Sequence, residues 1–436
     1  MAMPNKLIAG LFLLAFAGAA HATLPIQHWQ SASGAKVLFV ENHDMPMVDI
    51  KVDFAAGSGR DTPEKAGLAG MTRHLMALGA GDLTEDQISG KLADIGAELG
   101  GDFDRDVAGF SLRTLTSQRS EAVDLLAKIL DTPKFDQKVL DREKTRQIAQ
   151  IKEAEMDPGH IAAETFDKLL YGDHPYGLRG EGEIDTVRAF TRQNVVDFYR
   201  THYVTDREVI AIVGDLTREE AQAVADKLSA GLAAGKPIPP LPEVKLPISA
   251  ETKMIPYPSS QSHILIGYPG VTRDDPDYFP LLVGNYVLGG GGFESRLLNE
   301  VREKRGLAYS VYSYFYPLER KGPFEVGLQT RKDQTREALA IVKKTIDDYI
   351  AQGPTPKEIA AAKDNLVGGF PLRIDSNRKI VDYLAMIGFY HLPLTYLDDF
   401  TKKVDDVTAA QIRDAFSRRI NPADMVTVVV GAPSGG

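Results

Sequence analysis

Stretches of alternating apolar and polar residues predict half-buried strands in both halves of the chain. Residues 48–54 place four apolar side chains on one face, and Ile264 and Ile266 repeat the pattern in the second half. Each stretch is followed by apolar residues at helical spacing, which predicts helices over 66–78 and 279–288. The same order of elements therefore occurs twice.

The rest of the pattern mixes helices and strands without strict alternation. Thr84 and Gln87 form a capping box that begins a helix, which we expect to continue through Leu99. A strand is expected at 107–115, a hairpin at 308–315 and 323–329, and helices at 120–130, 137–155, 333–351 and 377–391. This mixture favours an α+β fold, with antiparallel-rich sheets and helices on one face of each.

An internal repeat supports a duplicated architecture. Thr191 to Gly214 aligns without a gap with Thr408 to Gly431, at an offset of 217 residues. The tetrapeptide at 60–63 matches that at 273–276 at an offset of 213. Between the halves, five prolines within residues 230–248 predict an extended linker. We expect two homologous α/β-sandwich domains, at 23–229 and 249–436.

The N-terminus predicts export. Lys6 precedes an apolar run at 7–20, which ends in Ala20-His21-Ala22. This pattern is typical of a cleaved signal peptide at 1–22 and indicates a periplasmic or secreted protein. An uncleaved membrane anchor is the alternative, but the run is shorter than the roughly 20 apolar residues of a spanning helix.

The amino-acid composition excludes several kinds of catalytic and binding site. The chain has no cysteine, which excludes disulfides, thiolate zinc ligands and a thiol nucleophile. Its formal net charge of −10 argues against nucleic acid as a partner. There is also no G-x-S-x-G nucleophile elbow.

Three segments together carry a family resemblance. They are GLAGMTRHLMALGAG at 67–81, YGDHPYGLRGEGEIDTVRAFT at 171–191 and GGGGFESRLLNEVREKRGLAYSVYSYF at 289–315. In this order, they resemble the pitrilysin and mitochondrial processing peptidase family, zinc peptidases with an H-x-x-E-H motif. In that motif two histidines at i and i+4 bind Zn²⁺, while the glutamate takes a proton from the bound water.

The zinc motif is degenerate in this chain. The resemblance places Gly70 at the first histidine, Arg73 at the glutamate and His74 at the second histidine. The third ligand falls near Gln150, with Glu153 and Glu155 close by in the sequence. An arginine cannot act as a base and would repel a divalent cation. We therefore expect no metal in this chain, with His74 as an ordinary polar residue. The repeat offers no substitute, because the offset of 213 carries the motif onto Val283, Tyr286 and Val287.

The second half keeps another feature of the family. Arg302 and Tyr309 have the spacing of the pair that, by the resemblance, binds the substrate backbone and its carbonyl oxygen. The glycines Gly289, Gly290, Gly291 and Gly292, followed by Phe293, are either a simple connection or a backbone that a peptide approaches closely. Without the resemblance, Arg302 would be interpreted as a surface residue and Tyr309 as strand packing. Tyr312, Tyr314 and Tyr316 share one strand face, which is typical of a core or interface.

The resemblance implies a role beside an active homologue. Some members of the family work as pairs in which one chain carries the zinc and the other the arginine and tyrosine. We expect a non-catalytic, substrate-binding subunit of a periplasmic heterodimeric zinc metallopeptidase, with the zinc in the partner. The alternatives are a stand-alone peptide-binding pseudoenzyme and, less favoured by the missing ligands, an enzyme with an unusual metal site.

Overall fold

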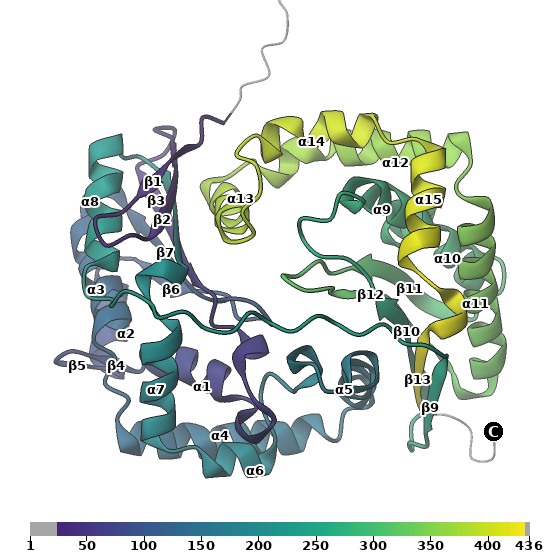
Figure 1. Ribbon diagram of the computed structural model, residues 1–436, viewed down its shortest axis with the longest axis horizontal. Coiled ribbons are helices and arrows are strands. Elements are labelled where there is room, and N and C mark those ends of the chain that lie inside the picture. The colour runs from purple at the N-terminus through teal and green to yellow at the C-terminus, as the bar shows by residue number, and fades with distance from the viewer. Residues whose placement is uncertain (1–23, 432–436) are drawn as a thin grey trace, which may run out of the picture.

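The computed structural model describes residues 24–431, so the expected signal peptide lies outside the described residues. The strands form two main sheets, which lie side by side with the first half at the left of Figure 1 and the second at the right. Four of the five strand pairings in the first sheet are antiparallel, as are three of the four in the second. The predicted α+β class with two similar halves is confirmed.

The first sheet contains the predicted alternating strand at its centre. Its strand order is β1-β2-β8-β3-β7-β6, and a two-stranded ribbon, β4 and β5, lies apart from it. The bounds are β1 Gln27–Gln30, β2 Lys36–Glu41, β3 Met47–Phe54, β4 Gly79–Ala80, β5 Leu83–Thr84, β6 Glu98–Gly100, β7 Ala108–Leu115 and β8 Glu208–Gly214.

The helices of the first half lie mostly on one face of this sheet and in the layer beyond it. They are α1 Leu68–Met76, α2 Glu85–Asp94, α3 Arg119–Asp131, α4 Gln137–Ala154, α5 Pro158–Tyr171, α6 Ile184–Ala189, α7 Arg192–His202 and α8 Arg218–Ser229. The expectation that the helix beginning after Thr84 reaches Leu99 was wrong. Gly96, at a φ of 62°, turns the chain after α2, and Leu99 lies in β6.

The second sheet has the order β11-β12-β10-β13-β9. Its strands are β9 Glu251–Ile255, β10 Gln261–Pro269, β11 Ala308–Phe315, β12 Pro323–Arg331 and β13 Val426–Val430. The helices are α9 Tyr278–Asn285, α10 Arg296–Leu298, α11 Thr335–Gln352, α12 Pro356–Gly368, α13 Asn377–Phe389, α14 Tyr396–Asp405 and α15 Ala409–Arg419. The helix expected through Leu288 changes at Asn285 into a π-helical turn, Tyr286–Gly290.

Each sheet also receives a helix from the opposite half on its other face. Helix α13 packs against β8, β3 and β2 of the first sheet, and its Val381 and Leu384 belong to the same buried core as Leu38 and Val209. Helix α5 packs Phe166 and Leu170 against β10 and β13 of the second sheet. In Figure 1 these two helices lie between the halves, α13 above and α5 below. The exchange supplies a second apolar layer that the sequence pattern did not predict.

The repeated segments have the same local structure, but different hydrogen bonds and ion pairs hold them in place. Thr191 and Thr408 both cap their helices, and Gly214 and Gly431 both have a positive φ at the end of the following strand. At the start of α1, Asp61 accepts hydrogen bonds from two backbone N–H groups, at 2.9 Å each.

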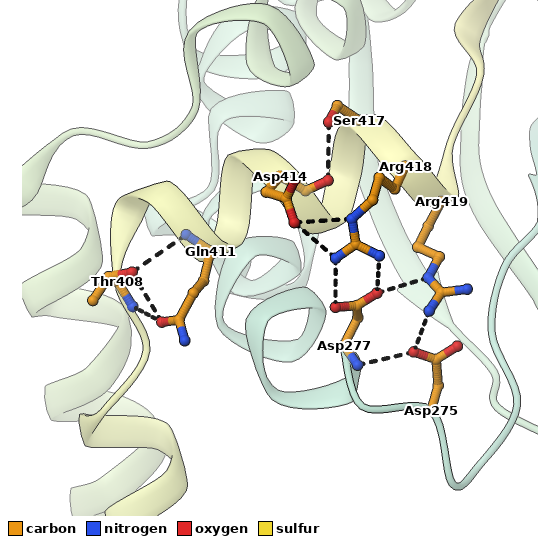
Figure 2. Close-up of polar contacts among 8 residues, drawn as sticks. All are labelled: Asp275, Asp277, Thr408, Gln411, Asp414, Ser417, Arg418 and Arg419. Carbon is orange, nitrogen blue, oxygen red and sulfur yellow. Dashed lines mark hydrogen bonds and ion pairs between the residues drawn. The ribbon is translucent and has the colours of Figure 1, made fainter.

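In the second half, ion pairs from two arginines hold the segment before helix α9. Figure 2 shows Arg418 and Arg419, at the end of α15, converging on Asp275 and Asp277 ahead of α9. Arg418 binds both carboxylate oxygens of Asp277 at 2.9 Å, and Arg419 reaches Asp277 and Asp275 at 2.7 and 2.8 Å. Such two-pronged contacts fix α15 against α9.

Residues 233–247 have neither helix nor strand and cross from the first half to the second (Figure 1). His174 anchors this segment, because its Nε2 lies 2.9 Å from the carbonyl oxygen of Pro242. Its Nδ1 accepts the N–H of Tyr176, so this loop histidine is structural. Within residues 24–431, no helix combines the length and the apolar character needed to cross a membrane.

Candidate functional site

The degenerate zinc motif lies on helix α1, and its first position lies close to a neighbouring aromatic ring. Gly70 faces the ring of Phe103, which would lie 3.2 Å from any Cβ placed at this position. The carbonyl oxygen of Gly180 would lie at 3.3 Å. A side chain here would require the Phe103 ring to shift by a few tenths of an ångström, and the glycine itself supplies no ligand atom.

Arg73 points into the protein and is bound by backbone oxygens. Its Nε and Nη2 donate to the carbonyl of Gly109 at 3.1 and 3.0 Å, and Nη2 also donates to Gly100 at 3.1 Å. The guanidinium lies 4.9 Å from the ring centre of Phe110. Burial lowers the pKa of the Arg73 guanidinium from its usual value. Arg73 thus braces β6 and β7 with donor groups only, and it cannot act as a general base.

His74, the one motif histidine, pairs with a carboxylate that sequence reasoning did not identify. Its Nε2 lies 2.9 Å from Oε2 of Glu143, a buried residue of α4. Glu143 also binds Nε of Arg142 at 2.7 Å and faces Arg146 at 3.5 Å. Burial by itself would raise the pKa of Glu143, but hydrogen bonds from His74 and Arg142 bring it below its usual 4.5. The arginines neutralise the carboxylate that a cation would need.

These residues do not fit a zinc ion. The structure brings His74 and Glu143 together, whereas Gln150 and Glu153 are exposed on α4 and Glu155 is exposed directly after it. Across residues 24–431 no group of three or more His, Cys, Asp or Glu side chains is arranged to hold a metal. In the second half, the equivalent positions are two buried valines and the half-buried Tyr286. Two protein ligands beside three arginines fall short of the three that a catalytic zinc requires.

The predicted pair in the second half does come together on the surface. Arg302 lies at the end of a π-helical turn, Asn299–Glu303, and Tyr309 lies at the start of β11. The guanidinium of Arg302 is 5.0 Å from the ring centre of Tyr309 and 5.1 Å from that of Phe293. Gly306, at a φ of 61°, makes the turn that brings the two segments together.

This cluster is open to solvent and its polar groups are largely free. Tyr309 and Phe293 are 84% and 71% exposed. Among the described residues, Arg302 has one ion pair, to Glu303 at 3.6 Å, and neither Arg302 nor the Tyr309 hydroxyl makes a side-chain hydrogen bond. Several fixed N–H donors and one O–H are therefore available to a peptide carbonyl.

The glycine run has two different environments. A Cβ on Gly289 would lie 2.4 Å from Oγ of Ser313, so this glycine allows the turn to pack against β11. A Cβ on Gly291 would lie 2.6 Å from the carbonyl oxygen of Tyr286. Gly292 has a φ of 56° and open space around it, next to the exposed Phe293. The first glycines serve packing, and only the end of the run lies beside the cluster.

The similarity to known proteins identifies the family. The insulinase family of M16 peptidases matches residues 36–180, and the M16 peptidase inactive domain matches residues 189–366. A solved structure described as a peptidase M16 inactive domain from Pseudomonas fluorescens is 37% identical, with a TM-score of 0.91 over 94% of this chain and 99% of that one. The chain belongs to the M16 peptidase family.

Other M16 relatives carry differing descriptions. A non-peptidase homolog, YmxG, of Helicobacter pylori is 25% identical and covers 98% of both chains. An uncharacterized zinc protease of Streptomyces coelicolor is 28% identical over 83% of this chain and 81% of its own length. A protease from Helicobacter pylori, 17% identical with a TM-score of 0.86, shares the fold. The match to the M16 inactive domain and the likeness to a solved structure of that description identify this chain as an M16 homologue of the inactive type.

Sequence reasoning found the arginine and tyrosine but missed Glu143 and Phe103. Glu143 lies 69 positions from His74 and carried no spacing signal. Phe103 lies in the loop between β6 and β7, and its contact with Gly70 depends on how that loop folds back over α1. Neither contact is encoded locally.

Proposed function

We propose that this chain is the non-catalytic, substrate-binding subunit of a heterodimeric zinc peptidase in the periplasm. A homologous partner would carry the zinc and supply the activated water. This chain would hold the substrate through Arg302 and Tyr309, which would face the partner's metal. The substrates would be unfolded polypeptides or short peptides.

One observation carries the proposal. At the zinc-motif positions Phe103 lies against Gly70 and the Arg73 guanidinium is bound to carbonyls, whereas Arg302 keeps its donors free beside the exposed Tyr309. Arg302 is half-buried between two aromatic rings, and it makes no side-chain hydrogen bond within the described part of the chain. It is well suited to bind a carbonyl oxygen, and the tyrosine hydroxyl can stabilise the oxygen as charge develops.

The test begins with the chain and its partner purified together from the periplasm, followed by separation and reconstitution. We expect peptide hydrolysis only from the mixture. Arg302→Ala should lower kcat/KM by about 10²-fold, the typical cost of losing a donor to the reacting oxygen. The matched control is Arg305→Ala, because Arg305 lies on the same segment but is bound to Glu300 at 2.7 Å.

Three results would count against the proposal. One is unchanged hydrolysis with Arg302→Ala. Another is chelator-sensitive hydrolysis by this chain alone. A third is the absence of any zinc-bearing partner, combined with tight peptide binding by the isolated chain, which would favour a stand-alone peptide-binding pseudoenzyme.

A further inference from the structure

Three tyrosines form a row along strand β11 that the Arg302 cluster does not use. Tyr312, Tyr314 and Tyr316 follow one another on one face, with ring centres 5.2 and 5.9 Å apart. Tyr314 and Tyr316 are 42% and 47% exposed. Val311 and Ser313, which alternate with the first two tyrosines, are buried. The row was expected to belong to a core or an interface, and it is not a core.

The neighbouring strand β12 leaves room for the tyrosine rings. Tyr312 lies opposite Gly327 of β12, where a Cβ would come within 2.3 Å of the tyrosine ring. The glycine therefore lets this ring lie flat across the strand, and its hydroxyl reaches Oε1 of Glu325 at 3.4 Å. Helix α5 covers β10 and β13 on this face, and the tyrosines of β11 lie beyond it.

The outer edge of β11 is not open to another strand. Asn285 donates from Nδ2 to the carbonyl oxygen of Ser313 at 2.8 Å, and Gly289 of the π-helical turn packs against the same residue. A peptide could not extend the sheet at this point, because an added strand needs these backbone groups. Recognition on this strand would have to use the side chains.

A hollow lies at each end of the row. The first, about 380 Å³, is lined by Tyr309, Tyr312 and Glu325 together with Ala162 and Ala163 of α5. The second, about 310 Å³, is lined by Tyr314 and Tyr316 with Tyr278, Tyr390, Asp104 and Arg273. Both volumes are at the lower end of the range of small-molecule pockets, which suits single large side chains.

We propose that the tyrosine row, Tyr312, Tyr314 and Tyr316, binds an extended polypeptide segment through aromatic or large aliphatic side chains two residues apart. Side chains on one face of an extended chain are spaced about 6.6 Å apart, close to the ring spacing. Tyrosine rings offer rigid apolar area with hydroxyl groups for hydrogen bonds. The first hollow is lined by Glu325 and His263, and the second by Asp104 and Arg273. Because neither hollow is lined by charges of one sign alone, both favour uncharged ligands.

The row also continues the Arg302 cluster, because Tyr309 lies on the same strand and lines the first hollow. A segment held by the row would therefore pass Arg302 and Tyr309. The inference rests on the proposed function in this respect: the row would select the substrate that the pair then orients. Binding to the isolated chain tests the row, whereas hydrolysis with the partner tests the pair.

The experiment measures fluorescence anisotropy with the full exported chain and fluorescein-labelled ten-residue peptides. One peptide carries Phe at alternate positions, and the other has Gln in their place. We expect the Phe peptide to bind at least tenfold more tightly. The double variant Tyr314→Ser/Tyr316→Ser should weaken its binding at least tenfold, whereas Tyr314→Phe/Tyr316→Phe should retain most of it.

The matched control is Met254→Ser, since Met254 is 45% exposed on β9 at the opposite edge of the same sheet. The Met254→Ser variant should bind the Phe peptide with unchanged affinity. Thermal unfolding would verify that each variant is folded. Equal affinity for the two peptides, or full binding by the folded serine double variant, would overturn the inference. Loss of hydrolysis in Arg302→Ala with normal peptide affinity would separate the pair from the row and support both assignments.

Discussion

At the scale of single residues, the positions of the degenerate zinc motif make structural contacts between elements. His74 and Arg142 hold Glu143, and Arg73 holds the carbonyls of Gly100 and Gly109. A buried carboxylate with hydrogen bonds to charged donors stabilises the fold more than a surface ion pair does. These contacts connect α1, α4 and the β6–β7 segment.

Glu143→Gln should therefore destabilise the protein in a pH-dependent way. The pKa of Glu143 is lowered in the folded state, so its stabilisation is present above the usual value of 4.5 and is lost as the pH falls through the lowered value. We expect a loss of about 1–2 kcal/mol at pH 7 that disappears in the acid range. Urea unfolding at pH 7 and at successively lower pH would measure this difference.

Glu85→Gln is the matched control, because Glu85 binds the same Arg142 at 2.7 Å from a more exposed position. It should cost less than about 0.5 kcal/mol. A Glu143→Gln effect that stayed constant into the acid range would contradict the ion-pair explanation.

The sequence was informative about what residues lack and less so about what they contact. Gly70 cannot be a ligand and Arg73 cannot be a base, whatever the fold. The role of Arg73 as a brace depends on carbonyls 27 and 36 positions away, and that of His74 on a glutamate 69 positions away. Such partners follow from tertiary packing, for which one sequence carries no local signal.

At the scale of elements, helix α13 shows how closely the two halves are fitted. Gly388 faces the first sheet, where a Cβ would lie 2.5 Å from Val209 and 2.7 Å from Leu38. Both neighbours belong to buried strands and have little room to move. The absence of a side chain at this position lets the helix approach the sheet.

A pair of identical substitutions tests this fit. Gly388→Ala should destabilise the protein by about 1–3 kcal/mol through overpacking. Gly368→Ala, near the end of α12 with nothing within 4 Å, should be neutral or slightly stabilising because alanine favours the helix. Chemical denaturation of the two variants would compare them, and equal effects would contradict the close packing of α13.

Helix and strand positions were largely predictable from periodicity, since α3, α4, α11, α13 and the β11–β12 hairpin lie within a few residues of their expected bounds. The end of α2 was missed because Gly96 adopts a positive φ, which the apolar pattern does not reveal. The placement of α5 and α13 was also missed. Their apolar faces are visible in the sequence, but the sheet that each one covers is not.

At the scale of the whole molecule, the halves are interlocked rather than merely connected. Besides the exchanged helices, Asp106 of the first half accepts hydrogen bonds from the Tyr390 hydroxyl at 2.9 Å and from the backbone N–H of Glu319 at 2.6 Å. Tyr176 donates to the same carboxylate, which is almost completely buried. Neither half has a complete core without the other.

We therefore expect the two halves to unfold together. Calorimetry of the purified protein should give a single transition, with equal calorimetric and van't Hoff enthalpies. Gly388→Ala should lower the midpoint of this whole transition, although it alters one helix. Two separate transitions, or a shift confined to part of the heat absorption, would contradict the interlocked architecture.

The exchange of helices also sets the order in which the chain can mature. Strands β2 and β8 are both made by residue 214, but the helix that covers them ends at residue 389. During synthesis and any passage through a membrane, an apolar surface with Leu38, Val209 and Ala211 stays uncovered until about 175 more residues have been made. A polypeptide interrupted before α13 would present this surface as a ready target for chaperones and quality-control proteases.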